Sequence, residues 1–112
     1  MEPQFVEFVH EQSGLGSRLS YRRMFGEYGF HLDGDFVAMA CDNTLFIKPT
    51  DAMGNLGIDL PTRPPHPGAK PYAVADRLLD DATQLRQLLV ETGPSLPVPK
   101  PKKSNGQGRI LD

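Results

Sequence analysis

"YGFHLDGDFVAMACDNTLFIK", residues 28–48, decides the fold of this chain. Its first part alternates the apolar residues Tyr28, Phe30 and Leu32 with other residues, which is the period of a β-strand. Asp33 and Gly34 form a dipeptide that two-residue hairpin turns prefer. A second turn signal follows at Asp42 and Asn43. The stretch therefore predicts three antiparallel strands joined in a meander.

The register of the third strand can be chosen by requiring one continuous apolar face, because a slip of one residue exchanges the two faces of a strand. A two-residue second turn would put Lys48 beside Val37, whereas a three-residue loop with a bulge puts Ile47 there. We therefore expect the bulged loop. The predicted core face is then Tyr28, Phe30, Leu32, Val37, Met39, Leu45 and Ile47.

The opposite face of the predicted meander is also apolar. It carries His31, Phe36, Ala38, Ala40, Phe46 and Lys48. A face of this kind needs cover, either from a helix or from a second copy of the chain. For a homodimer, the candidate contacts are Phe36, Ala38, Ala40 and Phe46.

Helices are predicted on both sides of the meander. The segment "EPQFVEFVHEQSGLG" gathers apolar residues on one side of a helix that Gly14 or Gly16 would end. The segment "DDATQLRQLLVET" has a leucine stripe, with Asp80 or Asp81 at its start and Gly93 at its end. Between them, Thr50 can cap a short helix, residues 58–71 read as loop, and residues 72–76 can add a short strand. We expect an α+β fold, an antiparallel sheet flanked by N- and C-terminal helices.

Size and composition exclude several classes of protein. A chain of 112 residues fits one small domain, and a net charge of −2 gives no overall attraction to nucleic acid or membrane. No apolar run approaches the roughly 20 residues that span a bilayer, and the N-terminus lacks the layout of a signal peptide. We therefore expect a cytoplasmic protein. The single cysteine, Cys41, excludes an internal disulfide and a four-cysteine zinc site.

No group of residues predicts catalysis or cofactor binding. Gly26 and Gly29 have the spacing of a phosphate loop, but such a loop must lead into a helix, and here a strand pattern follows. Cys41 lacks a well-placed histidine for activation. The three histidines, His10, His31 and His66, lack the spacing of metal ligands. We expect no catalytic, cofactor or metal residue, and hence no enzyme.

The end of the chain reads as a tail. We place the domain boundary at residue 92 and expect residues 93–112 to form a flexible tail rich in proline and lysine. Its basic residues, Lys100, Lys102, Lys103 and Arg109, are candidate phosphate contacts whose binding would fall steeply with salt. The alternative function is therefore that of a nucleic-acid accessory protein. A merely solubilising terminus is the other interpretation.

The order of motifs through residues 5–91 resembles the N-terminal domain of the TfoX/Sxy family of competence regulators. The resemblance is carried by Met24, Phe25, Gly26, Tyr28 and Gly29, then by "FVAMACDNTLFIK" and "GAKPYAVADRLLDDATQLRQLL". It implies an antiparallel sheet flanked by helices, of the kind found in secretion chaperones, and a homodimer. No catalytic or binding residue is carried over from the family.

The resemblance also implies a function. Two-domain members of the family are bacterial transcriptional coregulators of DNA-uptake genes, act alongside the cyclic-AMP receptor protein, and are not known as enzymes. This chain ends where their C-terminal helical domain begins, so we expect a single-domain relative. Its expected role is that of a non-enzymatic interaction module with a protein partner in transcription regulation.

Overall fold

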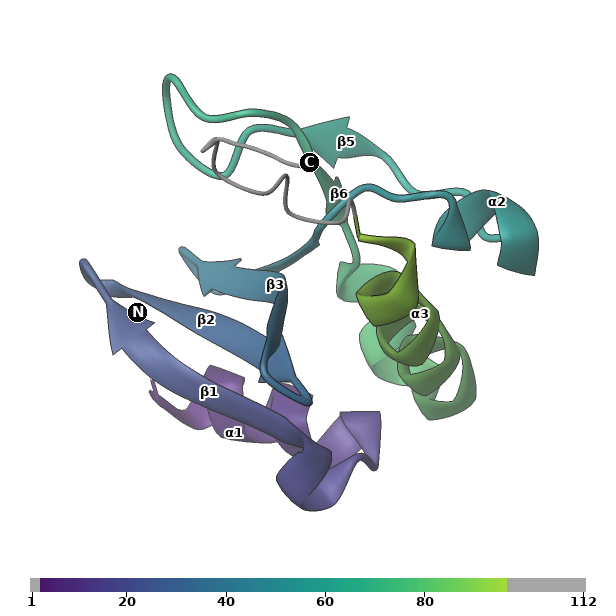
Figure 1. The fold of residues 1–112 in the computed structure, drawn as a ribbon. Coiled ribbons are helices and arrows are strands. Elements are labelled where there is room, and N and C mark those ends of the chain that lie inside the picture. Colours follow the sequence, from purple (N-terminus) through teal and green to yellow (C-terminus); the bar gives the residue numbers. More distant parts are fainter. Residues whose placement is uncertain (1–2, 97–112) are drawn as a thin grey trace, which may run out of the picture.

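The computed structural model describes residues 3–96, which form one antiparallel sheet with helices packed on it (Figure 1). The six strands lie in the order β1-β2-β3-β4-β6-β5. Their bounds are β1 Leu19–Met24, β2 Glu27–Leu32, β3 Asp35–Cys41, β4 Thr44–Ile47, β5 Thr62–Arg63 and β6 Tyr72–Val74. The predicted α+β class is confirmed, with two strands, β1 and β5, that the sequence interpretation did not contain.

The helices begin and end close to their predicted positions. Helix α1 spans Pro3–Ser13 and is followed by Gly14 at φ +67°, while α2 spans Ala52–Leu56. Helix α3 spans Ala82–Ser95, and the carboxylate of Asp81 caps it by accepting a hydrogen bond from the Gln84 N–H at 3.1 Å. It continues two residues beyond the predicted end at Gly93. Short 3₁₀ segments, Gly16–Arg18 and Asp76–Asp80, precede β1 and α3. None of the helices within residues 3–96 combines the length and apolar character needed to cross a membrane.

Three tight hairpins connect the first four strands. At each tip two residues have positive φ, namely Phe25 and Gly26, Asp33 and Gly34, and Asp42 and Asn43. Positive φ at both positions is the signature of a type I′ turn, whose twist matches that of paired strands. Cys41 therefore pairs with Thr44 across a two-residue turn. The expected three-residue loop at this position is wrong.

The bulge lies in the preceding hairpin instead. Leu32 pairs with Asp35 next to the turn, but the register shifts between Phe30 and His31, so that Phe30 pairs with Ala38 and Val37 is the extra residue. One extra residue reverses which side chains of β3 face the helices. Ala38 and Ala40 therefore face the helices, and Met39, which we expected in the core face, pairs with Phe46 on the other side.

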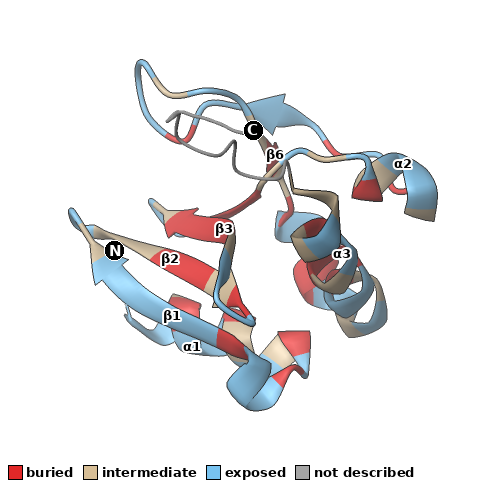
Figure 2. Ribbon diagram, viewed as in Figure 1, coloured by how far each residue is buried: buried red, intermediate tan, exposed pale blue. Residues whose placement is uncertain are grey.

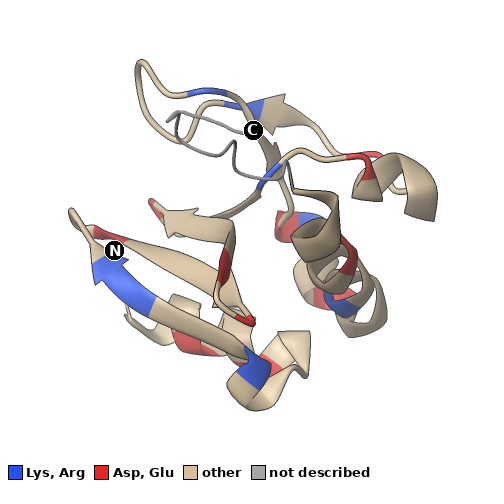
Figure 3. Cartoon of the chain, viewed as in Figure 1, with Lys and Arg blue, Asp and Glu red and all other residues tan. Residues whose placement is uncertain are grey.

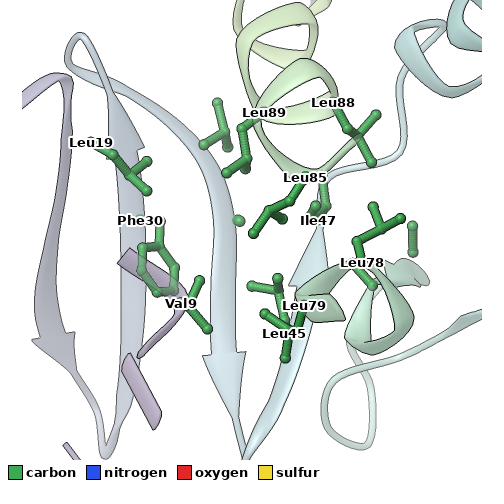
Figure 4. Packing of buried hydrophobic residues seen from close by; sticks show 14 of the residues in the cluster. Val9, Leu19, Phe30, Leu45, Ile47, Leu78, Leu79, Leu85, Leu88 and Leu89 are labelled. Atoms are coloured by element: carbon green, nitrogen blue, oxygen red, sulfur yellow. The ribbon is translucent and has the colours of Figure 1, made fainter. Parts of the chain in front are cut away.

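The core lies between the sheet and the two long helices (Figures 2 and 4). Phe30, Leu45 and Ile47 contribute large side chains from the sheet, while the leucine stripe of α3 and the valines of α1 close over them. Ala38 and Ala40 have no exposed surface. Their small side chains leave room for the larger residues of the helices, which is the alternation of size that dense packing requires.

The first hairpin tip differs from the other two in its chemistry, and this predicts a measurable effect on stability. Phe25 has φ +50° and is fully exposed, at 103%. A bulky residue in left-handed backbone costs about 1 kcal/mol relative to one that adopts it readily. We expect Phe25→Asn to raise the free energy of unfolding by about 1 kcal/mol in urea titration. Asp42→Phe, at the matching position of the third tip, is the converse variant and should lower it. An unchanged or lower stability for Phe25→Asn would contradict this account.

Candidate interaction surface

The face of the sheet opposite the long helices holds a small apolar cluster of Met24, Phe36, Met39 and Phe46. Gly29 lies beneath it, where a Cβ atom would come 3.0 Å from Cε1 of Phe36 and 3.1 Å from Cε of Met24. The glycine at this position thus allows the Phe36 ring and the Met24 side chain to lie directly on the backbone of β2. Gly29 therefore permits close packing of side chains on β2. The structure confirms that this stretch forms a hairpin and not a phosphate-binding loop.

Side chains of the same chain cover most of this cluster. The guanidinium of Arg63 lies 5.1 Å from the ring centre of Phe46, and the Nζ of Lys48 lies 5.2 Å from that of Phe36. Such contacts bring a cation over an aromatic face. Phe46 is left 1% exposed, while Phe36 remains half-buried.

The structure therefore corrects the expected dimer face. Ala38 and Ala40 lie on the helix side, because the bulge at Val37 turns them inward. Phe46 is on the expected side but is buried by its own chain. Of the four candidate contacts, Phe36 alone keeps surface that a second copy could reach. Self-association as such stays a prediction.

Cys41 lies at the end of β3 beside Glu27. Its Sγ–H donates to Oε2 of Glu27 at 3.0 Å, and the carbonyl of Pro65 lies 3.4 Å away. Burial raises the pKa of the Cys41 thiol to about 11 from its ordinary 9.0, and the carboxylates of Glu27 and Asp42 act in the same direction. A reactive cysteine needs the opposite, a depressed pKa. The thiol is held protonated.

The three histidines lie in different places and have different partners. His10 Nε2 contacts the carbonyl oxygen of Gly16 at 2.9 Å, and His31 packs against Phe36 with ring centres 5.4 Å apart. His66 lies in the proline-rich loop before β6, where its Nδ1 is 3.3 Å from the carbonyl of Pro67. Within residues 3–96, His, Cys, Asp and Glu side chains nowhere gather in a group of three that could hold a metal ion. The candidate phosphate contacts Lys100, Lys102, Lys103 and Arg109 lie outside the described residues.

A pocket of about 440 Å³ opens between the end of α1 and the helices α2 and α3. Leu15, Leu56 and Val90 form its apolar part, and Arg18, Arg86, Gln87 and Glu91 line the rest. The lining combines aliphatic side chains with guanidinium, amide and carboxylate groups, and it contains no thiol, hydroxyl or imidazole group. It offers a contact surface and no nucleophile with its base.

The β1–β2 hairpin is the most exposed aromatic and basic part of the described chain. Large exposed apolar side chains are Phe8, Tyr21 and Phe25, and two of these three belong to this hairpin. Arg22 and Arg23 lie between them and are exposed, and Figure 3 shows them as the blue part of β1. β1 was missed because only its first residue, Leu19, is fully buried, so the strand shows no alternation of apolar residues. The signal that could have indicated this strand is the pair Phe25–Gly26, which has the length of a two-residue hairpin turn and so implies a strand before β2.

The aromatic side chain of Tyr21 is held in place. Its ring centre lies 5.5 Å from that of His10, 5.9 Å from that of Phe30 and 6.2 Å from that of Tyr28, all with tilted or edge-on geometry. Aromatic rings prefer these arrangements. Tyr21 therefore presents a rigid surface on β1, and a partner that binds it would restrict little additional motion.

Comparison with known proteins identifies relatives. The family model described as the TfoX N-terminal domain matches residues 12–92. A protein of Spirochaeta aurantia, described as an uncharacterized 12.7 kDa protein in the trpE 5′ region, is 39% identical over 103 residues. That match spans 92% of this chain and 90% of the relative.

The environment of Cys41 predicts how its reactivity depends on pH. We expect the rate of alkylation by iodoacetamide to rise with a midpoint near pH 11, because burial and Glu27 raise the pKa of the thiol. Glu27→Gln should move the midpoint toward 9. The raised pKa also stabilises the fold below about pH 9, and this contribution is lost as pH rises from 9 to 11. Mass spectrometry measures the rate, with glutathione as the free-thiol control, and a midpoint at or below that of glutathione would contradict the assignment.

Proposed function

Because the chain belongs to the TfoX N-terminal domain family, we propose that it is a non-enzymatic protein-interaction module that acts in transcription regulation, and that it does so as a homodimer. The observation that carries the proposal is the β1–β2 hairpin, which exposes Tyr21 and Phe25 on either side of two arginines. Aromatic and arginine side chains dominate the energy of protein interfaces. The protonated thiol of Cys41 and the lining of the pocket between α2 and α3 support a role in binding over one in catalysis.

The regulatory role is tested by deletion and complementation. We expect deletion of the gene to change a defined set of transcripts, and the wild-type chain to restore them. Phe25→Asn should fail to restore them although it folds more stably, because it removes an exposed contact and relieves backbone strain. Phe8→Asn is the matched control, since Phe8 is an exposed phenylalanine on α1, and it should complement. Unchanged transcripts after deletion would remove the regulatory role, and full complementation by Phe25→Asn would remove the hairpin from it.

Self-association is proposed through the half-buried Phe36, which lies between Lys48 and His31 on the open face. Sedimentation equilibrium at high micromolar concentration should give twice the 12.4 kDa mass of the chain. Phe36→Ala should shift the distribution toward monomer, since burial of an aromatic ring contributes about 1–3 kcal/mol. Phe8→Ala serves as the control. A wild-type chain that stays monomeric would contradict the homodimer and leave the interaction with other proteins open.

A further inference from the structure

The tip of the β1–β2 hairpin carries a residue that neither turn chemistry nor packing explains. All three tight hairpins use two residues with positive φ. The second and third tips begin with Asp33 and Asp42, of a residue type that adopts this backbone readily, whereas the first begins with Phe25. Phe25 is strained, and its side chain is fully exposed. A residue that costs stability and makes no contact within the chain points to a contact outside it.

The strand beside this tip is an open edge of the sheet. The order of strands places β1 at one edge and β5 at the other (Figure 1). β5 has two residues and lies between Pro61 and Pro64, which lack an N–H group. β1 has six residues, contains no proline and pairs with β2 without a register shift. Its outward N–H and C=O groups can therefore pair with a further strand.

The side chains of β1 indicate which kind of strand could pair with its free edge. Arg22 and Arg23 are neighbours, so they lie on opposite faces of β1, and within residues 3–96 neither takes part in an ion pair. Pairing β1 with the same strand of a second copy would bring four guanidinium groups together. Opposite charges on directly paired strands attract and like charges repel. The edge thus favours a strand with neighbouring carboxylates, one for each face.

We propose that the β1–β2 hairpin binds an extended acidic segment of a partner protein, which pairs with the free edge of β1 and sets an aromatic side chain against Phe25. Neighbouring carboxylates of that segment lie beside Arg22 and Arg23, and the ring of Tyr21 supports the segment on the helix side. The inference rests on the proposed function as an interaction module, and it names the surface and the chemistry of the partner.

The experiment uses the full chain, labelled for NMR, and blocked synthetic peptides. The probe is TVTDEVTV with a tryptophan added at its amino end or its carboxyl end, and the comparison peptides replace DE by NQ. We expect the acidic probe to shift the amide resonances of β1 and to slow their hydrogen exchange. The NQ peptides should bind about tenfold more weakly. Arg22→Glu together with Arg23→Glu should abolish binding, while Lys70→Glu, at an exposed basic residue in the loop before β6, should leave it unchanged.

The tryptophan end tests the role of Phe25 separately. One of the two tryptophan-bearing acidic peptides should bind more tightly than the parent peptide TVTDEVTV, which has no tryptophan. Only one direction of the bound strand brings the tryptophan to the tip of the β1–β2 hairpin. Phe25→Asn should cancel that gain and leave the affinity for the parent unchanged. Equal binding of all peptides to Phe25→Asn and the wild type would overturn the contact at Phe25.

Other outcomes overturn the choice of partner. Failure of the acidic probe to shift β1 resonances at millimolar concentration, or equal binding of the NQ peptides, excludes an acidic strand. If hydrogen exchange of the β1 amides slows as the protein concentration rises without peptide, the edge pairs with a second copy of the chain. Stronger shifts of the same amides by a short DNA duplex assign it to nucleic acid. If any of these is found while Phe25→Asn still fails to complement, the interaction module stands and only the chemistry of its partner is wrong.

Discussion

One extra residue in β3 sets the arrangement of everything packed on the sheet. The bulge at Val37 changes the phase of the strand, so Ala38 and Ala40 face the helices and Met39 faces away. Without the bulge, the larger side chain of Met39 would lie under the helices, and the two alanines would lie on the open face. A one-residue change in register reverses every side chain of a strand. The close packing of α1 and α3 on the sheet therefore depends on this single irregularity.

The same bulge determines which surfaces are free to bind. It places Met39 beside Phe46 and Phe36, a cluster large enough to need cover, and the chain supplies that cover with Arg63 and Lys48. Cations over aromatic rings keep the face polar toward water while the rings stay largely dry. A surface that would otherwise be an apolar interface is thereby mostly closed. Two of the three large exposed aromatic side chains, Tyr21 and Phe25, lie on the β1–β2 hairpin.

The β1–β2 hairpin has two features that lower the stability of the chain and that suit the binding proposed for it. Its tip keeps a phenylalanine in left-handed backbone where aspartate stands in the two other tips, and its outer strand leaves a six-residue edge unpaired. Both features lower the stability of an isolated chain, and both are useful to a chain that binds another. The opposite edge has the common protective device, a short strand between prolines. This contrast between the two edges is the reason for proposing that a partner binds at β1.

The sequence by itself determined the meander of residues 28–48 and the positions of the two long helices, because each of these has a local signature: alternation, turn dipeptides and capping residues. The family resemblance rested on the same segments. The tertiary structure alone decided the place of the bulge, since a bulge in either hairpin keeps Leu45 and Ile47 in the core and the pattern of apolar residues satisfies both. It also decided that β1 is a strand. An edge strand buries few side chains, so its sequence carries little periodic signal, and its pairing with β2 follows from the hairpin geometry at Phe25 and Gly26.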